Sequence, residues 1–264
     1  MQHTARKRFG QHFLVDRHYI DRIVAAVDPR ADDRLVEIGP GLGALTRPLL
    51  ERVRHLTAVE IDRDIAAMLR GAFPQDRLTV CEQDALTFDF AAVGDELRVV
   101  GNLPYNISSP LLFRLAAASA WLRDMHFMLQ KEVVERMAAA PATPAYGRLS
   151  VMLQYRFEVV PLFHVPPGAF RPPPKVESAV VRLLPLASRA LAPRDESLLA
   201  EVVRRAFGQR RKTLRNALKG LADEDLLRGL GLDPAARAEV LPVAAFVAIA
   251  NAAAGARLTP PSSG

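Results

Sequence analysis

The feature that most constrains the fold is a regular alternation of short apolar runs and helix-like stretches between residues 34 and 130. Five runs have the length and composition of β-strands, at 34–38, 56–61, 78–82, 97–100 and 126–130. Helical stretches lie between them, for example at 44–53, 63–73 and 109–118. Strands that alternate with helices form parallel sheets covered on both faces. We therefore predict an α/β fold of the Rossmann-like kind.

The second half of the chain changes character. Two more β-like stretches, 156–165 and 178–184, flank a proline-rich loop too short for a crossover helix, which predicts an antiparallel hairpin at the sheet edge. Residues 185–194 have the composition of a linker, and only helical patterns follow, at about 195–207, 210–220, 223–229, 234–239 and 243–253. We predict two domains: a sheet domain over 1–185 and a small all-helical domain over 195–256.

Composition narrows the class of protein. Half of the 264 residues are hydrophobic and the net charge is +6, which favours a polyanionic partner such as nucleic acid. A single cysteine, Cys81, excludes an internal disulfide framework and suits a reducing compartment. The longest apolar stretch, 243–256, is shorter than the roughly 18–20 residues that a membrane span needs. We expect a cytoplasmic protein without a membrane partner, and no pattern indicates a metal site.

A glycine-rich turn follows the first predicted strand. It reads VEIGPGLGALT (36–46), with Gly39 and Gly41 at its centre, and such a turn lets a ligand approach the backbone closely. The spacing fits both a nicotinamide dinucleotide and S-adenosyl-L-methionine, and Glu60 at the end of the second strand suits the ribose of either cofactor. Asp84, at the end of the third strand, is a candidate acceptor for the adenine amine or, alternatively, a helix cap. This turn alone does not decide between a nicotinamide dinucleotide and S-adenosyl-L-methionine.

The stretch GNLPYN (101–106) follows the fourth predicted strand and contains no titratable catalytic group. An exocyclic amine is a poor nucleophile because its lone pair is delocalised into the base. If the Asn102 amide oxygen and the Leu103 carbonyl accepted hydrogen bonds from the two amine hydrogens, the lone pair would become localised on the nitrogen. Pro104 stiffens the turn, and Tyr105 offers a ring on which a base can stack. The pattern favours methyl transfer to a base amine, and it disfavours an oxidoreductase, which would need a proton donor.

Six motifs carry a resemblance to a known family. They are KRFGQHFL (7–14), NLPYNISSPLLF (102–113), MLQKEVVERM (128–137), AYGRLSVMLQY (145–155), FRPPPKVESAVVRL (170–183) and AFGQRRKTLRNAL (206–218). In this order the chain resembles the ribosomal RNA adenine N6,N6-dimethyltransferases, most closely those of the bacterial small subunit. The resemblance runs from about residue 6 to 250 and implies a class I methyltransferase sheet.

The resemblance also implies an activity and a set of residues. The family uses S-adenosyl-L-methionine to dimethylate two adjacent adenosines in the 3′-terminal hairpin of 16S rRNA, on an assembling small subunit. By motif position, the cofactor contacts fall on His12, Leu14, Gly39, Glu60, Asp84 and Asn102, and the glycine turn adds Gly41. Many members have Asn where this chain has His12. Phe170 is implied as the aromatic ring that holds the target base against Tyr105, and a core phenylalanine is the alternative.

A run of positive charge extends from Arg204 to Lys219 and contains no acidic residue. We read this basic run as a helix that docks on rRNA phosphates, with Arg210, Arg211, Lys212 and Arg215 as the contacts; a solvated helix face is the alternative. We expect a monomer. Two other functions stay open, a ribosome-assembly binding factor with secondary methylation and an adenine N6-methyltransferase acting on another nucleic acid.

Overall fold

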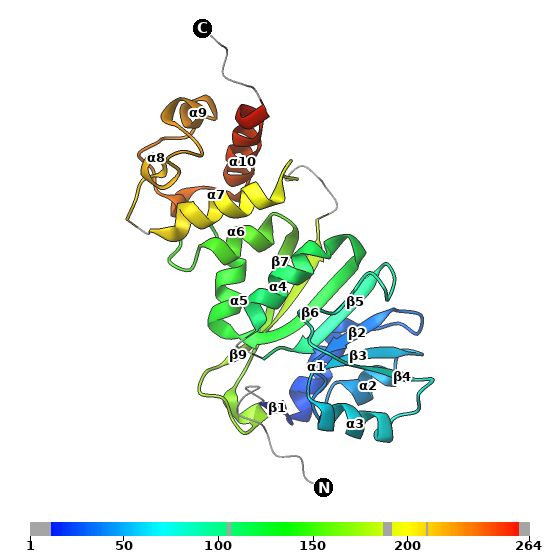
Figure 1. Ribbon diagram of the computed structural model, residues 1–264. Helices are drawn as coiled ribbons and strands as arrows, with labels where there is room; N and C mark the ends of the chain where they lie inside the picture. Colours follow the sequence, from blue (N-terminus) through cyan, green and yellow to red (C-terminus); the bar gives the residue numbers. More distant parts are fainter. Residues whose placement is uncertain (1–11, 105–106, 187–191, 210, 259–264) are drawn as a thin grey trace. The chain divides into compact units, whose positions relative to one another are not determined.

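The computed structural model describes residues 12–104, 107–186, 192–209 and 211–258 (Figure 1). The chain forms two compact units. The first unit comprises residues 1–134 and 158–185, and the second comprises residues 135–157 and 186–264. The predicted ranges differ from this division in one segment, because residues 135–157 group with the helical unit.

The described part of the first unit contains a seven-stranded sheet of order β4-β3-β2-β5-β6-β9-β7. Its strands are β2 (Leu35–Ile38), β3 (Leu56–Glu60), β4 (Leu78–Glu82), β5 (Leu97–Asn102), β6 (Leu122–Gln130), β7 (Phe157–Val165) and β9 (Ser178–Pro185). The pairs among β4, β3, β2, β5 and β6 are parallel, and β9 runs antiparallel to β6. The predicted Rossmann-like α/β sheet is confirmed, and the last two predicted strands are neighbours at its edge.

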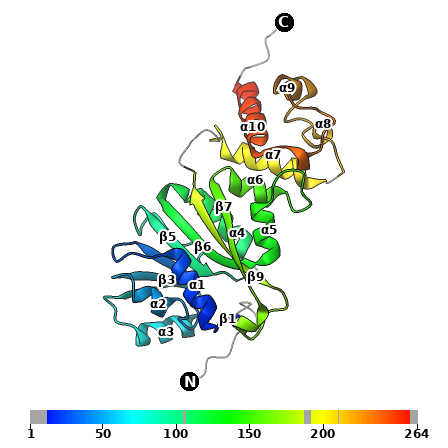
Figure 2. The ribbon, with the colours of Figure 1, turned by 180° about the vertical axis from the view of Figure 1, so that it is seen from behind.

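Four helices accompany this sheet in the described residues: α1 (Arg17–Val27), α2 (Thr46–Leu50), α3 (Arg63–Ala72) and α4 (Ser108–Ala117). Helices α1 to α3 bury their apolar residues in one hydrophobic cluster with β2, β3 and β4, and α4 lies on the other face (Figures 1 and 2). Helix α1 was not predicted. Its sequence carried the signal, since Ile20, Ile23, Val24 and Val27 follow helical spacing and Asp16 accepts from the His18 backbone N–H at 2.9 Å.

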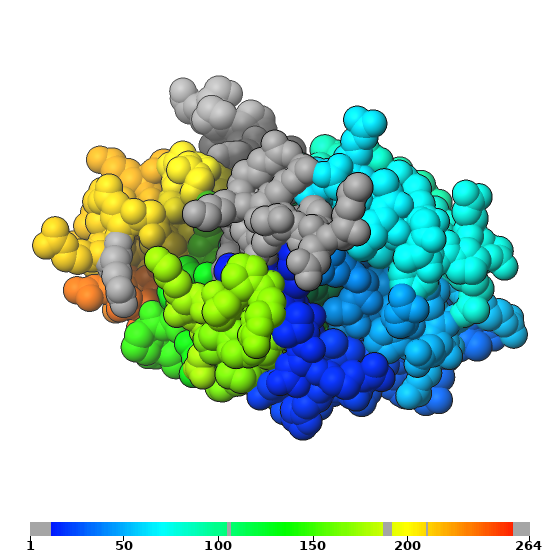
Figure 3. All heavy atoms as spheres, turned by 90° about the horizontal axis from the view of Figure 1, so that it is seen from below, coloured from blue at the N-terminus to red at the C-terminus, as the bar shows by residue number. Residues whose placement is uncertain are grey.

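A second, two-stranded sheet was also not predicted. β1 (Phe13–Leu14) pairs antiparallel with β8 (Phe170–Arg171), so that the start of the described chain lies against the proline-rich loop. In Figure 3 the blue N-terminal surface meets the yellow-green surface of this later segment. Strands of two residues carry almost no pattern of their own, which explains why the sequence reading missed them.

The second unit is helical. Its elements are the end of α5 (Lys131–Ala138), α6 (Arg148–Gln154), α7 (Glu196–Gly208), α8 (Leu214–Ala217), α9 (Glu224–Gly229), a short 3-10 turn (Ala238–Val240) and α10 (Val243–Leu258). Tyr146, Val151 and Tyr155 belong to the hydrophobic core of this unit, which is why their segment groups here. The Tyr146 hydroxyl donates to the Leu241 carbonyl at 2.9 Å. The predicted all-helical C-terminal domain is confirmed, and no described helix has the length and apolarity of a membrane span.

Candidate active site

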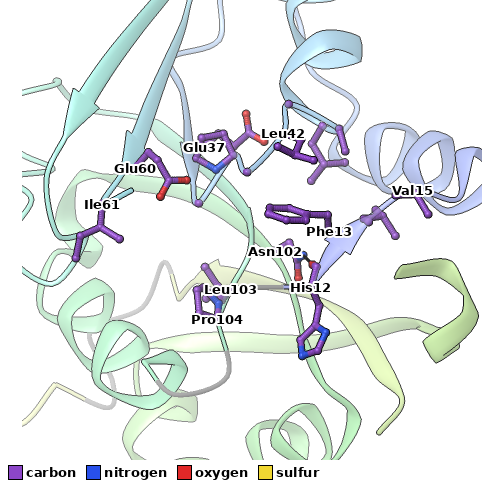
Figure 4. Close-up of a pocket in the computed structure, with 17 residues that line it drawn as sticks. His12, Phe13, Val15, Glu37, Leu42, Glu60, Ile61, Asn102, Leu103 and Pro104 are labelled. Carbon is purple, nitrogen blue, oxygen red and sulfur yellow. Dashed lines mark hydrogen bonds between the residues drawn. The ribbon is translucent and has the colours of Figure 1, made fainter. Parts of the chain in front are cut away.

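A pocket opens at the carboxyl ends of β2, β3 and β5, where ligands bind in open α/β sheets (Figure 4). Its volume is ≈ 200 Å³, and it is lined by residues 12–15, Glu37, residues 39–45, Glu60, Ile61 and residues 102–104. Eight of the predicted site residues lie in this lining: His12, Leu14, Gly39, Gly41, Glu60, Asn102, Leu103 and Pro104. The structure therefore brings together residues separated by up to about ninety positions of sequence. We call this cavity the strand-end pocket.

The glycine turn forms one wall of the pocket. Gly39, Gly41 and Gly43 have φ angles of +65°, +55° and +84°, which L residues rarely adopt. A Cβ on Gly41 would lie 3.1 Å from the Phe13 ring. Glycine is therefore required here for two reasons, the backbone conformation and the close approach of an aromatic side chain. The bare backbone of the turn fits the close contact that a nucleotide-like cofactor makes with such a loop.

Glu60 lies at the end of β3 with 6% of its surface exposed, and its Oε1 accepts from the Asp62 backbone N–H at 2.8 Å. Burial raises the pKa of Glu60, while hydrogen bonds from the backbone N–H groups of Asp62, Gly41 and Ile61 oppose that rise. The hydrogen bond with Gly41 ties the carboxylate to the glycine turn. A carboxylate held at the pocket wall in this way suits the hydroxyls of a ribose.

Glu37 is a pocket residue that was not predicted as a site residue, although it opens the same glycine motif. It is 1% exposed, and its Oε2 accepts from the Thr46 hydroxyl at 2.7 Å. Burial raises the pKa of Glu37 to about 7, the Thr46 hydrogen bond lowers it, and the nearby Glu60 charge raises it further. The sequence signal was present in the spacing Glu37-x-Gly39, but its burial could only be read from the fold.

Asn102 has a fixed orientation in the structure. Its side-chain nitrogen donates to the His12 backbone carbonyl at 2.9 Å, which leaves the amide oxygen as the acceptor of this side chain (Figure 4). The Leu103 backbone N–H donates to the Met128 carbonyl at 3.1 Å and anchors the turn to β6. The first contact leaves the Asn102 oxygen available as an acceptor, and the acceptor role of the Leu103 carbonyl stays a prediction. Tyr105 lies outside the described residues.

The N-terminal side of the pocket is held in place by the small sheet. The His12 ring nitrogen Nδ1 lies 2.8 Å from the Pro172 carbonyl, so the imidazole donates there. Leu14 is buried and pairs in register with Phe170. His12 therefore lines the pocket with its ring turned to the Pro172 carbonyl, while its backbone carbonyl accepts from Asn102.

Among the described residues, two of the predicted cofactor and base contacts do not line the pocket. The Asp84 carboxylate accepts from the Leu86 backbone N–H at 2.9 Å in a turn that no helix follows, so the alternative of a helix cap is wrong, and the side chain is half-buried. Phe170 is 1% exposed and lies in the hydrophobic cluster of the first unit, which fits the alternative of a core phenylalanine. Their roles with the cofactor and the target base stay predictions.

The basic run is not one helix, which corrects the sequence reading. It covers the end of α7, a connection and the short α8, with Arg211 and Lys212 exposed in the connection and Arg210 outside the described residues. It also has acidic neighbours in space. Glu201 pairs with Arg204 and Arg205, and Glu224 lies 3.4 Å from Arg215. Glu201 and Glu224 lie just outside the run in sequence. Glu201 reaches its arginines within α7, and Glu224 reaches Arg215 from the neighbouring α9.

Comparisons with known proteins agree with the sequence motifs. The family model described as "Ribosomal RNA adenine dimethylase" matches residues 2–255. The "Ribosomal RNA small subunit methyltransferase A" of Thiobacillus denitrificans is 62% identical over 247 residues, covering 94% of this chain and 97% of the relative. The protein of the same name from Chromobacterium violaceum is 59% identical over 251 residues, covering 95% and 96%.

Solved structures show the same fold. A dimethyladenosine transferase from Plasmodium falciparum superposes with a TM-score of 0.77 at 27% identity, covering 90% of this chain and 96% of its own. The 23S rRNA methyltransferase ErmE gives a TM-score of 0.69 at 26% identity, covering 92% and 99%. The full-length matches in sequence, together with the glycine turn and the Asn102 turn at one pocket, lead to a single assignment. The chain belongs to the ribosomal RNA adenine dimethylase family, and it is a methyltransferase.

Proposed function

We propose that the protein transfers methyl groups from S-adenosyl-L-methionine to N6 of two adjacent adenosines in the 3′-terminal hairpin of 16S rRNA, within an assembling small subunit. Relatives about 60% identical over the whole chain are named small subunit methyltransferases, which supports the choice of subunit. The observation that carries the chemistry is the hydrogen bond from Asn102 to the His12 carbonyl, because it fixes which end of the amide faces an incoming amine.

The residues of the pocket account for the donor site. S-adenosyl-L-methionine, when bound, supplies a methyl group activated by a positively charged sulfur. The glycine turn offers backbone that a ligand can approach closely, and Glu60 offers a carboxylate for ribose hydroxyls. Two acidic side chains, Glu37 and Glu60, give the pocket a negative character that suits a cation. The exposed side chains of Leu42 and Ile61 add an apolar rim that suits a flat base.

The Asn102 turn accounts for the activation of the amine. The Asn102 amide oxygen and the Leu103 carbonyl accept the two hydrogens of the adenine amine and localise its lone pair toward the methyl carbon. The new N–C bond forms as the C–S bond breaks, and the electrons of that bond go to sulfur. The amine becomes cationic and then loses a proton, so a strong base is not needed. The protein contributes alignment and removal of water.

We assign the docking of rRNA to Arg211 and Lys212 first, because both are exposed and sit outside the ion pairs with Glu201 and Glu224. Arg215 is a weaker candidate, since Glu224 partly neutralises it. An rRNA substrate and a single cysteine both suit a cytoplasmic protein, and we propose that it acts as a monomer.

One experiment tests the proposed function. The protein is incubated with methyl-labelled S-adenosyl-L-methionine in two separate reactions, one with unmethylated small subunits and one with unmethylated large subunits. The second reaction is included because a structural relative is a 23S rRNA methyltransferase. We expect label in dimethyladenosine of the small-subunit RNA, at two adjacent positions of its 3′ hairpin. Label confined to the large subunit, or at a single separate adenosine, would contradict the proposal.

A further inference from the structure

Two carboxylates share the strand-end pocket. Glu37 and Glu60 come from the neighbouring strands β2 and β3, and both reach the cavity (Figure 4). They are 1% and 6% exposed, and in the described residues neither takes part in an ion pair with a lysine or arginine. Buried carboxylates without a cation are costly when charged. Ionising both carboxylates in this pocket therefore costs desolvation free energy.

The groups around Glu37 determine whether its carboxyl is protonated or ionised. Glu60 adds negative charge beside Glu37 from the β3 side, and Asp62 in turn adds negative charge beside Glu60. The Thr46 hydroxyl on α2 and the Asn102 amide at the end of β5 are neutral, and the His12 ring is turned to the Pro172 carbonyl. Burial raises the pKa of Glu37 to about 7, so at neutral pH this carboxyl is close to half protonated in the free pocket.

The two forms of the cofactor differ by one unit of charge. S-adenosyl-L-methionine carries a sulfonium cation beside its amino-acid group, whereas the spent form, S-adenosyl-L-homocysteine, has a neutral thioether there. A positive charge in a buried site favours the ionised form of a nearby carboxyl, and a neutral group does not.

We propose that Glu37 releases its proton to solvent when the cationic methyl donor binds and keeps it beside the spent donor. The pocket then prefers fresh over spent donor more strongly as pH rises. This inference rests on the proposed function, namely that the pocket takes S-adenosyl-L-methionine. It assigns to Glu37 a role beyond a structural contact, as the residue that distinguishes the donor from its product by charge.

The direction of the pH dependence follows by linkage. Below pH 7 the donor must displace a proton from Glu37, and above pH 7 the site is already ionised. Donor affinity should therefore rise roughly tenfold between pH 6 and pH 8 if binding holds the carboxyl ionised throughout. Affinity for the spent donor should change much less over the same range.

The test is titration calorimetry of the full-length protein with each cofactor form at pH 6, 7 and 8. At pH 7 the measurement is repeated in two buffers of different protonation enthalpy. We expect release of on the order of half a proton with the donor and close to none with the spent donor. Donor binding without proton release and with equal affinity at all three pH values overturns the inference. A failure of the donor to bind at any pH contradicts the proposed function instead.

Two variants assign the proton to Glu37. Glu37→Gln keeps the size of the side chain and an acceptor for Thr46, so the donor should bind at pH 8 no more tightly than to wild type at pH 6, with no proton release. Thr46→Val removes a hydrogen bond that stabilises the carboxylate, so the midpoint of the pH dependence should move upward. Glu158→Gln, at an exposed glutamate of β7, is the matched control and should retain the wild-type profile. A Glu37→Gln protein with wild-type proton release would overturn the assignment.

Discussion

The strand-end pocket and the basic run each bring together charges of one sign, but the surroundings of those charges differ. In the pocket, Glu37 and Glu60 are buried and are held by hydroxyl and backbone N–H groups. In the described part of the basic run, Arg204, Arg211, Lys212 and Arg215 are exposed, and Arg204, Arg205 and Arg215 share the carboxylates of Glu201 and Glu224. A small number of buried charges can therefore dominate a site. A larger number of surface charges is partly neutralised by neighbouring carboxylates before any RNA binds.

The physical reason is the medium around each group. A charge in a protein interior interacts several times more strongly than one in water, and salt screens it poorly. Exposed ion pairs contribute roughly 0–1 kcal/mol and weaken as salt rises. Substitutions in the pocket should therefore act strongly and independently of salt, and substitutions in the basic run should act weakly and depend on salt.

The largest effect should come from Asn102→Ala. Loss of the amide oxygen removes one of the two acceptors for the target amine, and loss of the amide nitrogen frees the His12 carbonyl. We expect turnover on small subunits to fall by about two to three orders of magnitude, as for other preorganised polar groups in active sites. Single-turnover rates at saturating donor measure this directly. Gln75→Ala, at an exposed amide residue, is the control, and near wild-type turnover of Asn102→Ala would rule out the mechanism.

A smaller effect is expected for Glu60→Ala. A carboxylate that binds ribose hydroxyls acts on the donor alone, so donor affinity should fall by roughly 2 kcal/mol, or about thirty-fold. The loss should be nearly the same at low and high salt because Glu60 is 6% exposed. Calorimetry at two salt concentrations checks both statements, and subunit binding should be unchanged. A strongly salt-dependent loss would remove the distinction between the two regions.

The double variant Arg211→Ala with Lys212→Ala should weaken subunit binding and leave donor affinity unchanged. If each side chain neutralises a phosphate, the plot of log affinity against log salt should lose up to about one unit of slope per contact. Subunit binding is measured at several salt concentrations, with Arg52→Ala, an exposed arginine of the first unit, as the control. Parallel lines for wild type and double variant would show that the two side chains do not contact phosphates and that the basic run faces solvent.

The smallest effect is expected for Glu224→Gln, and it has the opposite sign. The substitution releases Arg215 from its acid and leaves Arg228 beside the Asp225 carboxylate at 3.9 Å, so Arg215 becomes available to phosphate. Since exposed pairs are worth about 0.2–1 kcal/mol, subunit affinity should rise by a few-fold and the salt slope should steepen. A thermal melt controls for the loss of a carboxylate in the first turn of α9. A fall in affinity would show that Glu224 holds Arg215 in the binding geometry.

Much of the sheet could be predicted because its signal is local. A strand buried on both faces is mostly apolar, as in 97–100, where Arg98 is the one charged residue and is paired with Asp33 and Asp124, and a parallel partner demands a crossover of helical length. The strands therefore appear within a few residues of their predicted positions. The glycine turn and the Asn102 turn followed from the same logic, since they lie at the ends of adjacent parallel strands, whereas His12 and Leu14 came from the family resemblance.

What could not be predicted depends on contacts between distant parts of the chain. The pairing of Phe13 with Arg171, the burial of Phe170 and the neutralisation of Arg215 by Glu224 all arise from side chains that meet only after folding. The high pKa of Glu37 is of the same kind, because it depends on solvent exclusion and on Glu60 rather than on neighbouring residues. A sequence shows which groups are present, but not how much water reaches them.

The pairing of β1 with β8 also has a consequence for the order in which the enzyme becomes competent during its own synthesis. His12 leaves the ribosome early, but its ring partner, the Pro172 carbonyl, lies 160 positions later in the chain. The carbonyl that orients Asn102 belongs to the same N-terminal segment. Long-range contacts of this kind form late in folding. The nascent chain therefore completes the contacts that position His12, and with it the Asn102 amide, only after Pro172 has emerged.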